Sequence, residues 1–178
     1  RLPDRGRVAG PVVVRRDHVS LGGGGSIDLG GIVKGWTADQ VGRLLRERGA
    51  QTVIVDAGGD LLVANDEGTP ELIGLGVKGY SVRLAQGAVA TSSVLKRRWQ
   101  TEGGEGHHII APETRLPAGT RFALASVVEP DAATADALAT ALLADPDRAL
   151  PALGILRRRR CWRTTRATAS SATRCGGC

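Results

Sequence analysis

The 178-residue chain contains no methionine, few aromatic residues and no long apolar run. Phe, Tyr and Trp together make up 3% of the residues, so Ala, Val, Leu and Gly must supply most of any core. No segment approaches the ~20 consecutive apolar residues of a membrane-spanning helix, and the sequence therefore predicts none. The apolar content of 42% and the length suit one globular domain with a real core.

Acidic residues are absent after residue 150, and cysteine is absent before Cys161. The segment from Pro151 onward holds seven arginines, which leaves the rest of the chain close to neutral, at −1, although the net charge is +6. A nucleic-acid-binding function that the basic charge would favour is therefore not expected of the body. One CxxC pair, Cys175 to Cys178, is weak support for zinc, and an odd cysteine count argues against a disulfide framework. We expect a domain over residues 1–150 and a disordered Arg-rich tail over 151–178.

Short β-branched runs separated by Gly-rich breaks predict strands over most of the chain. Between about residues 32 and 48, apolar residues recur at helical spacing and Gly49 follows where a helix would end. A second helix is predicted over "DAATADALATALLAD", with Asp131 placed to cap it, and "PDRALPALGI" resembles the start of a third. Runs of strands interrupted by a few helices favour an α+β fold over a regular βαβ winding.

The stretch "SIDLGGIVKGW" places Asp28, Gly30, Gly31 and Lys34 around the start of the first predicted helix. Unpaired backbone N–H groups at a helix start attract anions, and glycines let the backbone approach a ligand closely. A phosphate and metal site is therefore one interpretation of this stretch. The other is structural: Asp28 caps the helix and Lys34 is a solvated side chain.

Two further motifs carry acidic residues. "DAGGD" is first of all a hairpin turn, but its glycines also allow Asp60 to approach a ligand without bulk. Asp136 and Thr140 lie four residues apart on one face of an Ala-rich helix and offer two hard oxygen ligands suited to Mg²⁺. Because most helical Asp residues are solvated, we expect removal of the Asp136 carboxylate to leave the fold largely intact.

The segment "HHII" places His107 and His108 on opposite faces of a predicted strand, so only one of them can face a pocket. In "ATSS", Ser92 and Ser93 offer hydroxyl groups that are ordinary in strands and turns. Neither motif specifies a function alone.

Together and in this order, the motifs resemble one family, the ApbE-type flavin transferases, or FAD:protein FMN transferases. Its members show "DLGxxxKG", "AGGD", "ATSG", "HHIIDPxTG" and "DALxT". Here they stand as "DLGGIVKG", "AGGD", "ATSS", "HHIIAPETR" and "DALAT" within roughly residues 11–150. Ser93, Ala111 and Arg115 replace the family's Gly, Asp and Gly, so the turn around Arg115 is expected to differ. The resemblance also makes the chain an N-terminally truncated fragment with an atypical tail.

The resemblance implies an α+β, T-fold-like mixed sheet with a few packed helices. It implies Mg²⁺-dependent transfer of FMN from FAD to a Thr or Ser hydroxyl of an acceptor protein, with release of AMP. By the same resemblance, Gly31, Asp136 and Thr140 would hold Mg²⁺. Asp28, Lys34 and Ile110 would contact FAD, and Asp60 and His108 would lie near the flavin or the attacking hydroxyl.

Alternatives to this activity are hydrolysis of FAD to FMN and AMP, and flavin binding without turnover. Family analogy leaves the compartment open between the bacterial cell envelope and the cytoplasm, with membrane association only through residues outside this chain. Nucleic acid is not an expected partner, and the acceptor and the oligomeric state stay undetermined.

Overall fold

The structure is a computed structural model that describes residues 11–24, 26–75, 79–101, 104–155 and 163–166. The chain divides into two units, residues 1–30 and 31–178. In the first unit, β1 (Val12–Val14) and β2 (Val19–Leu21) form an antiparallel hairpin that leads into a 3-10 turn at Gly22–Gly24. The β-branched run forms β1, and a turn closed by a hydrogen bond from the Arg15 N–H to the His18 carbonyl (2.9 Å) separates it from β2.

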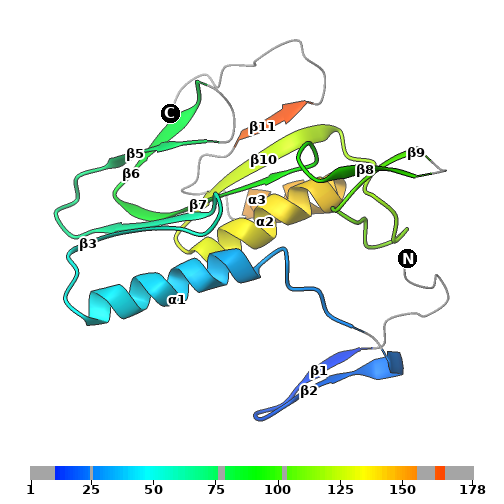
Figure 1. The fold of residues 1–178 in the computed structure, drawn as a ribbon, viewed down its shortest axis with the longest axis horizontal. Helices are drawn as coiled ribbons and strands as arrows, with labels where there is room; N and C mark the ends of the chain where they lie inside the picture. Colours follow the sequence, from blue (N-terminus) through cyan, green and yellow to red (C-terminus); the bar gives the residue numbers. More distant parts are fainter. Residues whose placement is uncertain (1–10, 25, 76–78, 102–103, 156–162, 167–178) are drawn as a thin grey trace. The chain divides into compact units, whose positions relative to one another are not determined.

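The second unit contains a five-stranded sheet in the order β11-β10-β7-β4-β3, and each pair of neighbouring strands is antiparallel (Figure 1). Its strands are β3 (Thr52–Asp56), β4 (Leu61–Asn65), β7 (Gln86–Ser93), β10 (Phe122–Glu129) and β11 (Arg163–Arg166). Two hairpins accompany the sheet: β5 (Glu71–Gly74) with β6 (Ser81–Leu84), and β8 (Arg98–Thr101) with β9 (Gly104–His107). The predicted α+β class is confirmed.

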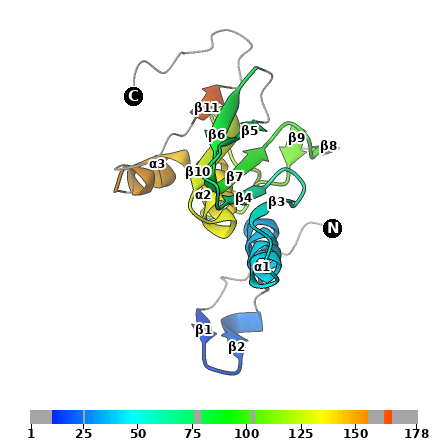
Figure 2. The ribbon, with the colours of Figure 1, turned by 90° about the vertical axis from the view of Figure 1, so that its left-hand side faces the viewer.

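Three helices belong to this unit: α1 (Val33–Glu47), α2 (Ala132–Ala144) and α3 (Pro146–Ile155). Helix α2 packs on β7 and β10 and also contacts α1 and α3, so it lies at the centre of the helical layer (Figures 1 and 2). The predicted cap is confirmed, because the Asp131 side chain accepts a hydrogen bond from the Thr134 N–H at 2.8 Å. Helix α1 ends before Gly49, whose φ of 91° lies in the left-handed region that glycine tolerates.

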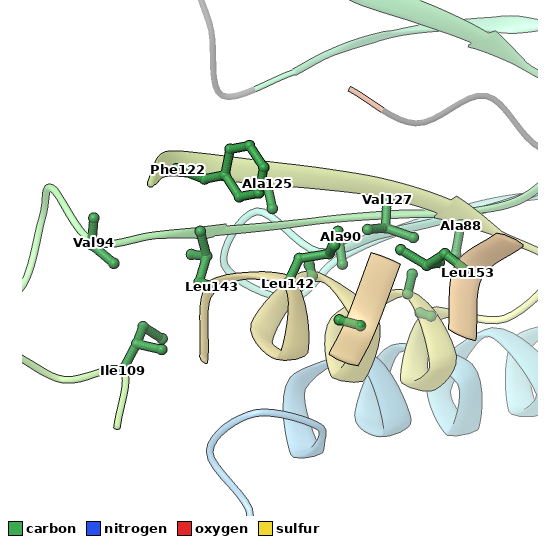
Figure 3. Close-up of a cluster of buried hydrophobic side chains, with 14 of the residues drawn as sticks. Ala88, Ala90, Val94, Ile109, Phe122, Ala125, Val127, Leu142, Leu143 and Leu153 are labelled. Atoms are coloured by element: carbon green, nitrogen blue, oxygen red, sulfur yellow. The ribbon is translucent and has the colours of Figure 1, made fainter. Parts of the chain in front are cut away.

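The two faces of the sheet carry different cores. Residues of β7 alternate: Ala88 and Ala90 pack in the larger cluster with α2, whereas Val89 packs in a smaller one with Val63 and Ile73. Figure 3 shows the larger cluster, in which Leu142 and Leu143 of α2 lie against the alanines of the sheet. The small side chains of the sheet let α2 pack close to it. The position of α2 in turn determines the positions of α1 and α3, which pack on it.

Helix α3 crosses residue 150, where the sequence placed the end of the domain, and β11 adds a strand beside β10 from the region assigned to the tail. Residues 156–162 and 167–178, with all three cysteines, lie outside the described residues. Disorder of those residues stays a prediction.

Candidate functional site

Two buried carboxylates and one lysine meet where α1 begins. Lys34 stands in the first turn of α1, and its ammonium donates to Asp60 Oδ2 and lies 3.2 Å from Asp136 Oδ1. Asp60 follows the turn between β3 and β4, and Asp136 lies on α2. Both acids are 1% exposed, whereas the Lys34 side chain is 39% exposed. Residues from three distant stretches of sequence therefore form one ionic cluster that solvent reaches on the lysine side.

Each of the two carboxylates also accepts a hydrogen bond from a backbone N–H. The Thr91 N–H donates to Asp60 Oδ1 and the Gly35 N–H donates to Asp136 Oδ2, each at 3.3 Å. The expectation that Asp136 is a solvated surface carboxylate is wrong. Its removal leaves a buried N–H and an ammonium without their acceptor, so the fold does not tolerate the change freely.

The environment shifts the protonation of this cluster. Burial raises the pKa of Asp60; the hydrogen bond from Lys34 opposes that shift, and the charge of Asp136 adds to it. Burial alone would lower the pKa of Lys34, but the hydrogen bonds and charges of the two carboxylates outweigh it and raise that pKa. Lys34 therefore stays protonated at neutral pH and holds the two carboxylates together.

Thr140 lies one turn beyond Asp136 on α2, and its hydroxyl is 3.0 Å from that of Ser92 on β7. Gly31 approaches it so closely that a Cβ atom added there would lie 3.1 Å from Thr140 Cγ2. The Gly31 backbone, Asp136 and Thr140 thus lie along one side of α2. The structure brings five of the eight predicted residues together: Gly31, Lys34, Asp60, Asp136 and Thr140.

Asp28 belongs to the first unit, whereas the carboxylate cluster belongs to the second. Its Oδ1 accepts a hydrogen bond from the Gly30 N–H at 2.7 Å, which closes a short turn. The alternative in which Asp28 caps the helix is wrong, because the N-cap residue of α1 is Ile32, without a side-chain cap.

The two histidines differ in burial, but the predicted strand over "HHII" ends at His107, so His108 lies outside it. His107 is buried at the end of β9, and its Nε2 donates to the Ala118 carbonyl at 3.1 Å. His108 is exposed on the following loop, and partial burial together with the charge of Arg97 lowers its pKa. Ile110 is exposed and pairs with Pro117. Among the described residues, neither His108 nor Ile110 hydrogen-bonds to the carboxylate cluster.

Arg115 keeps a φ of 56° although it stands where the family has glycine. Its N–H donates to the Ala111 carbonyl at 2.9 Å, and the Ala111 N–H donates to the Leu116 carbonyl at the same distance. Arg115 thus adopts a left-handed φ in a hydrogen-bonded turn, and a difference of this turn from that of the family stays a prediction. The surrounding hydrogen bonds hold Arg115 in a conformation that costs a residue with a Cβ atom about 1–2 kcal/mol.

Asp39 was not among the predicted site residues. Its two carboxylate oxygens accept hydrogen bonds from the N–H groups of Ala132 and Ala133, at 2.8 and 2.9 Å. The signal was available in the spacing, because Asp39 lies four residues after Gly35 and so shares its side of α1.

Among the described residues, no group of three or more His, Cys, Asp or Glu side chains gathers as a metal site. The donors beside Lys34 are carboxylate, hydroxyl and backbone oxygens, which Mg²⁺ and not a thiophilic metal prefers. Within the same described ranges, no helix is long and apolar enough to cross a membrane.

The sequence model described as the ApbE family matches residues 9–158. The chain is 31% identical over 126 residues to an FAD:protein FMN transferase of Vibrio cholerae, a match covering 66% of this chain and 38% of that protein. It is 32% identical over 135 residues to one of Treponema pallidum, covering 66% and 37%. The crystal structure of an ApbE protein from Thermotoga maritima matches 86% of this chain and 53% of that one, with a TM-score of 0.73 and 28% identity. The chain thus spans well under half the length of the curated relatives it matches.

Proposed function

This chain belongs to the ApbE family, and we propose that it forms the metal- and phosphate-binding part of an FAD:protein FMN transferase. The reaction would move FMN from FAD to a Thr or Ser hydroxyl of an acceptor protein and release AMP. Relatives that carry this enzyme's name support the proposal. The observation on which the proposal mainly depends is that two buried carboxylates converge on Lys34 beside the Gly31–Thr140 contact.

The residues fit a bound Mg²⁺. The Asp136 carboxylate, the Thr140 hydroxyl and the Gly31 carbonyl are hard oxygen donors on adjoining backbone, and Mg²⁺ often takes its other ligands from water and substrate phosphates. A Cβ atom at position 31 would crowd Thr140, which gives glycine a reason to stand there. When bound, the ion would supply positive charge to a pyrophosphate at the point of cleavage.

The roles that we propose for the other site residues follow from their charge and their exposure to solvent. Lys34 is the one cation in the described cluster and is partly exposed, which supports a role as a donor to the FAD pyrophosphate. Buried Asp60 orients that ammonium from behind. Asp60 and His108 remain our candidates for residues near the attacking hydroxyl, and Asp28 and Ile110 for FAD contacts.

The activity is tested with the complete gene product, FAD, Mg²⁺ and an acceptor protein carrying a Thr or Ser site. Covalently bound flavin on the acceptor supports the transferase. Free FMN without modified acceptor would identify an FAD pyrophosphatase, and intact bound FAD would identify a flavin-binding module.

The metal site is tested by Thr140→Val, which removes the hydroxyl and keeps the shape. We expect Mg²⁺ affinity, measured by calorimetry, to fall by on the order of tenfold or more while the melting temperature changes little. Thr134→Val on the same helix is the matched control, since its side-chain hydroxyl forms no part of the cluster. Equal Mg²⁺ affinities in the two variants would contradict the site.

A further inference from the structure

The segment from Gly31 through α1 runs antiparallel to α2 and meets it at three positions spaced four residues apart. Gly31 faces Thr140, where an added Cβ would come within 3.1 Å of the side chain. Gly35 donates its N–H to Asp136 Oδ2 at 3.3 Å. Asp39 accepts from the N–H of Ala132 at 2.8 Å. The proposed site uses the first two positions and leaves the third, Asp39, without a role.

Asp39 binds the start of α2 from a different helix. The N–H groups of Ala132 and Ala133 belong to the first turn of α2, where no carbonyl of the same helix can accept from them. Asp131 serves only the next N–H, that of Thr134. Both carboxylates satisfy the helix end and its dipole, but only the one on α1 ties the two helices together.

The contact allows little sliding. A Cβ atom at Gly35 would lie 2.1 Å from the Ala132 carbonyl oxygen, so the backbone of α1 rests directly on the first turn of α2. A displacement of α2 by one residue along its axis, about 1.5 Å, would break the Gly35–Asp136 hydrogen bond and separate Asp136 from Lys34.

We propose that Asp39 is a positioning residue for the metal and phosphate site. Its two hydrogen bonds fix the register of α2 on α1, and thereby hold Asp136 and Thr140 against Lys34 and Gly31. The consequence for metal binding rests on the proposed function, whereas the register itself does not.

The register is tested by amide hydrogen exchange of Gly35 in the complete protein, with Asp39→Ala compared with Asp131→Ala. Both variants remove a carboxylate from the same helix end, and only the first cuts the link between the helices. We expect exchange at Gly35 to accelerate by on the order of tenfold in Asp39→Ala and to stay near the wild-type rate in Asp131→Ala. Asp39→Asn, which keeps one acceptor oxygen, should fall between them, and it replaces Asp39→Ala if that variant does not fold.

The second measurement is Mg²⁺ affinity by calorimetry on the same proteins. Asp39→Ala should weaken binding by on the order of tenfold, and Asp131→Ala should not. Equal exchange of Gly35 in the two variants would overturn the proposal. Faster exchange with unchanged Mg²⁺ affinity would overturn its link to the site. If the wild-type protein binds no Mg²⁺, the proposed metal site fails, and the exchange rates still decide the register.

Discussion

Helix α1 buries small residues and exposes large apolar ones, which is the reverse of the usual arrangement. The side against α2 and the sheet carries Gly35, Ala38 and Gly42, which are buried, whereas the opposite side carries large apolar residues such as Trp36 and Leu44, 54% and 44% exposed. Helix α2 has buried residues of both kinds, from Ala135 to Leu142. The difference shows that α1 is held by close backbone approach and by the ions at its start, and not by large side chains.

The comparison predicts that adding one methyl group at Gly35, where α1 rests on the backbone of α2, does more harm than removing large groups from the outer side. In Gly35→Ala, the new Cβ would lie 2.1 Å from a backbone carbonyl oxygen that cannot turn aside. We expect a loss of about 3 kcal/mol or more in unfolding free energy, measured by urea denaturation, because α1 must move away from α2.

Gly42→Ala is the control, because its Cβ would meet only the end of the Leu62 side chain, at 2.2 Å. That side chain can rotate, and alanine gains about 1 kcal/mol in helix propensity, so the net change should be small. Equal losses at the two glycines would show that backbone contact with α2 is not the reason for Gly35.

Lys34→Met tests how much the ionic cluster at the start of α1 contributes to stability. The change leaves Asp60 and Asp136 buried without a cation, and we expect a loss of about 2–3 kcal/mol at pH 7, moderated by the partial exposure of the lysine. Without the ammonium, the pKa of Asp60 rises further above its ordinary value of 3.8. The folded variant then binds more protons than the unfolded chain, so its stability increases as the pH falls from 7 towards 5.

The wild-type protein should behave differently in two ways. Its gain in stability between pH 7 and 5 should be smaller than that of the variant, because the hydrogen bond from Lys34 opposes the rise in the pKa of Asp60. At high pH it should lose stability as Lys34 deprotonates above its ordinary pKa of 10.5, because the raised pKa makes its contribution present below that value and lost above it. Denaturation of both proteins across pH 5–11 measures these differences. A variant with the wild-type pH profile would mean that Lys34 does not compensate the carboxylates.

A substitution on the exposed side of α1 should change the unfolding free energy least. Leu44→Gln replaces an exposed side chain, and we expect a change within about 0.5 kcal/mol. Leu142→Ala in α2, where the side chain is fully buried, should cost about 2–5 kcal/mol by the same denaturation measurement. A large loss at Leu44 would contradict the exposure of the outer side.

Local patterns were sufficient for much of this protein. Helical spacing predicted α1 and α2, Asp131 was identified as a cap, and the glycines of "DAGGD" marked the turn between β3 and β4. These features depend on residues within a few positions of one another, so the sequence contains the whole cause. The motifs also led to the family that the comparisons show.

Tertiary contacts decided what those patterns left open. The apolar repeat of α1 gave the right helix but lies on its exposed side, because only glycine and alanine let α1 approach α2. Asp136 is buried and not solvated, since Lys34, 102 positions away, and the Gly35 N–H meet it there. Arg115 keeps a glycine-like φ because its neighbours hold it. In each case burial and charge depend on distant residues, and no local spacing specifies which of them arrive.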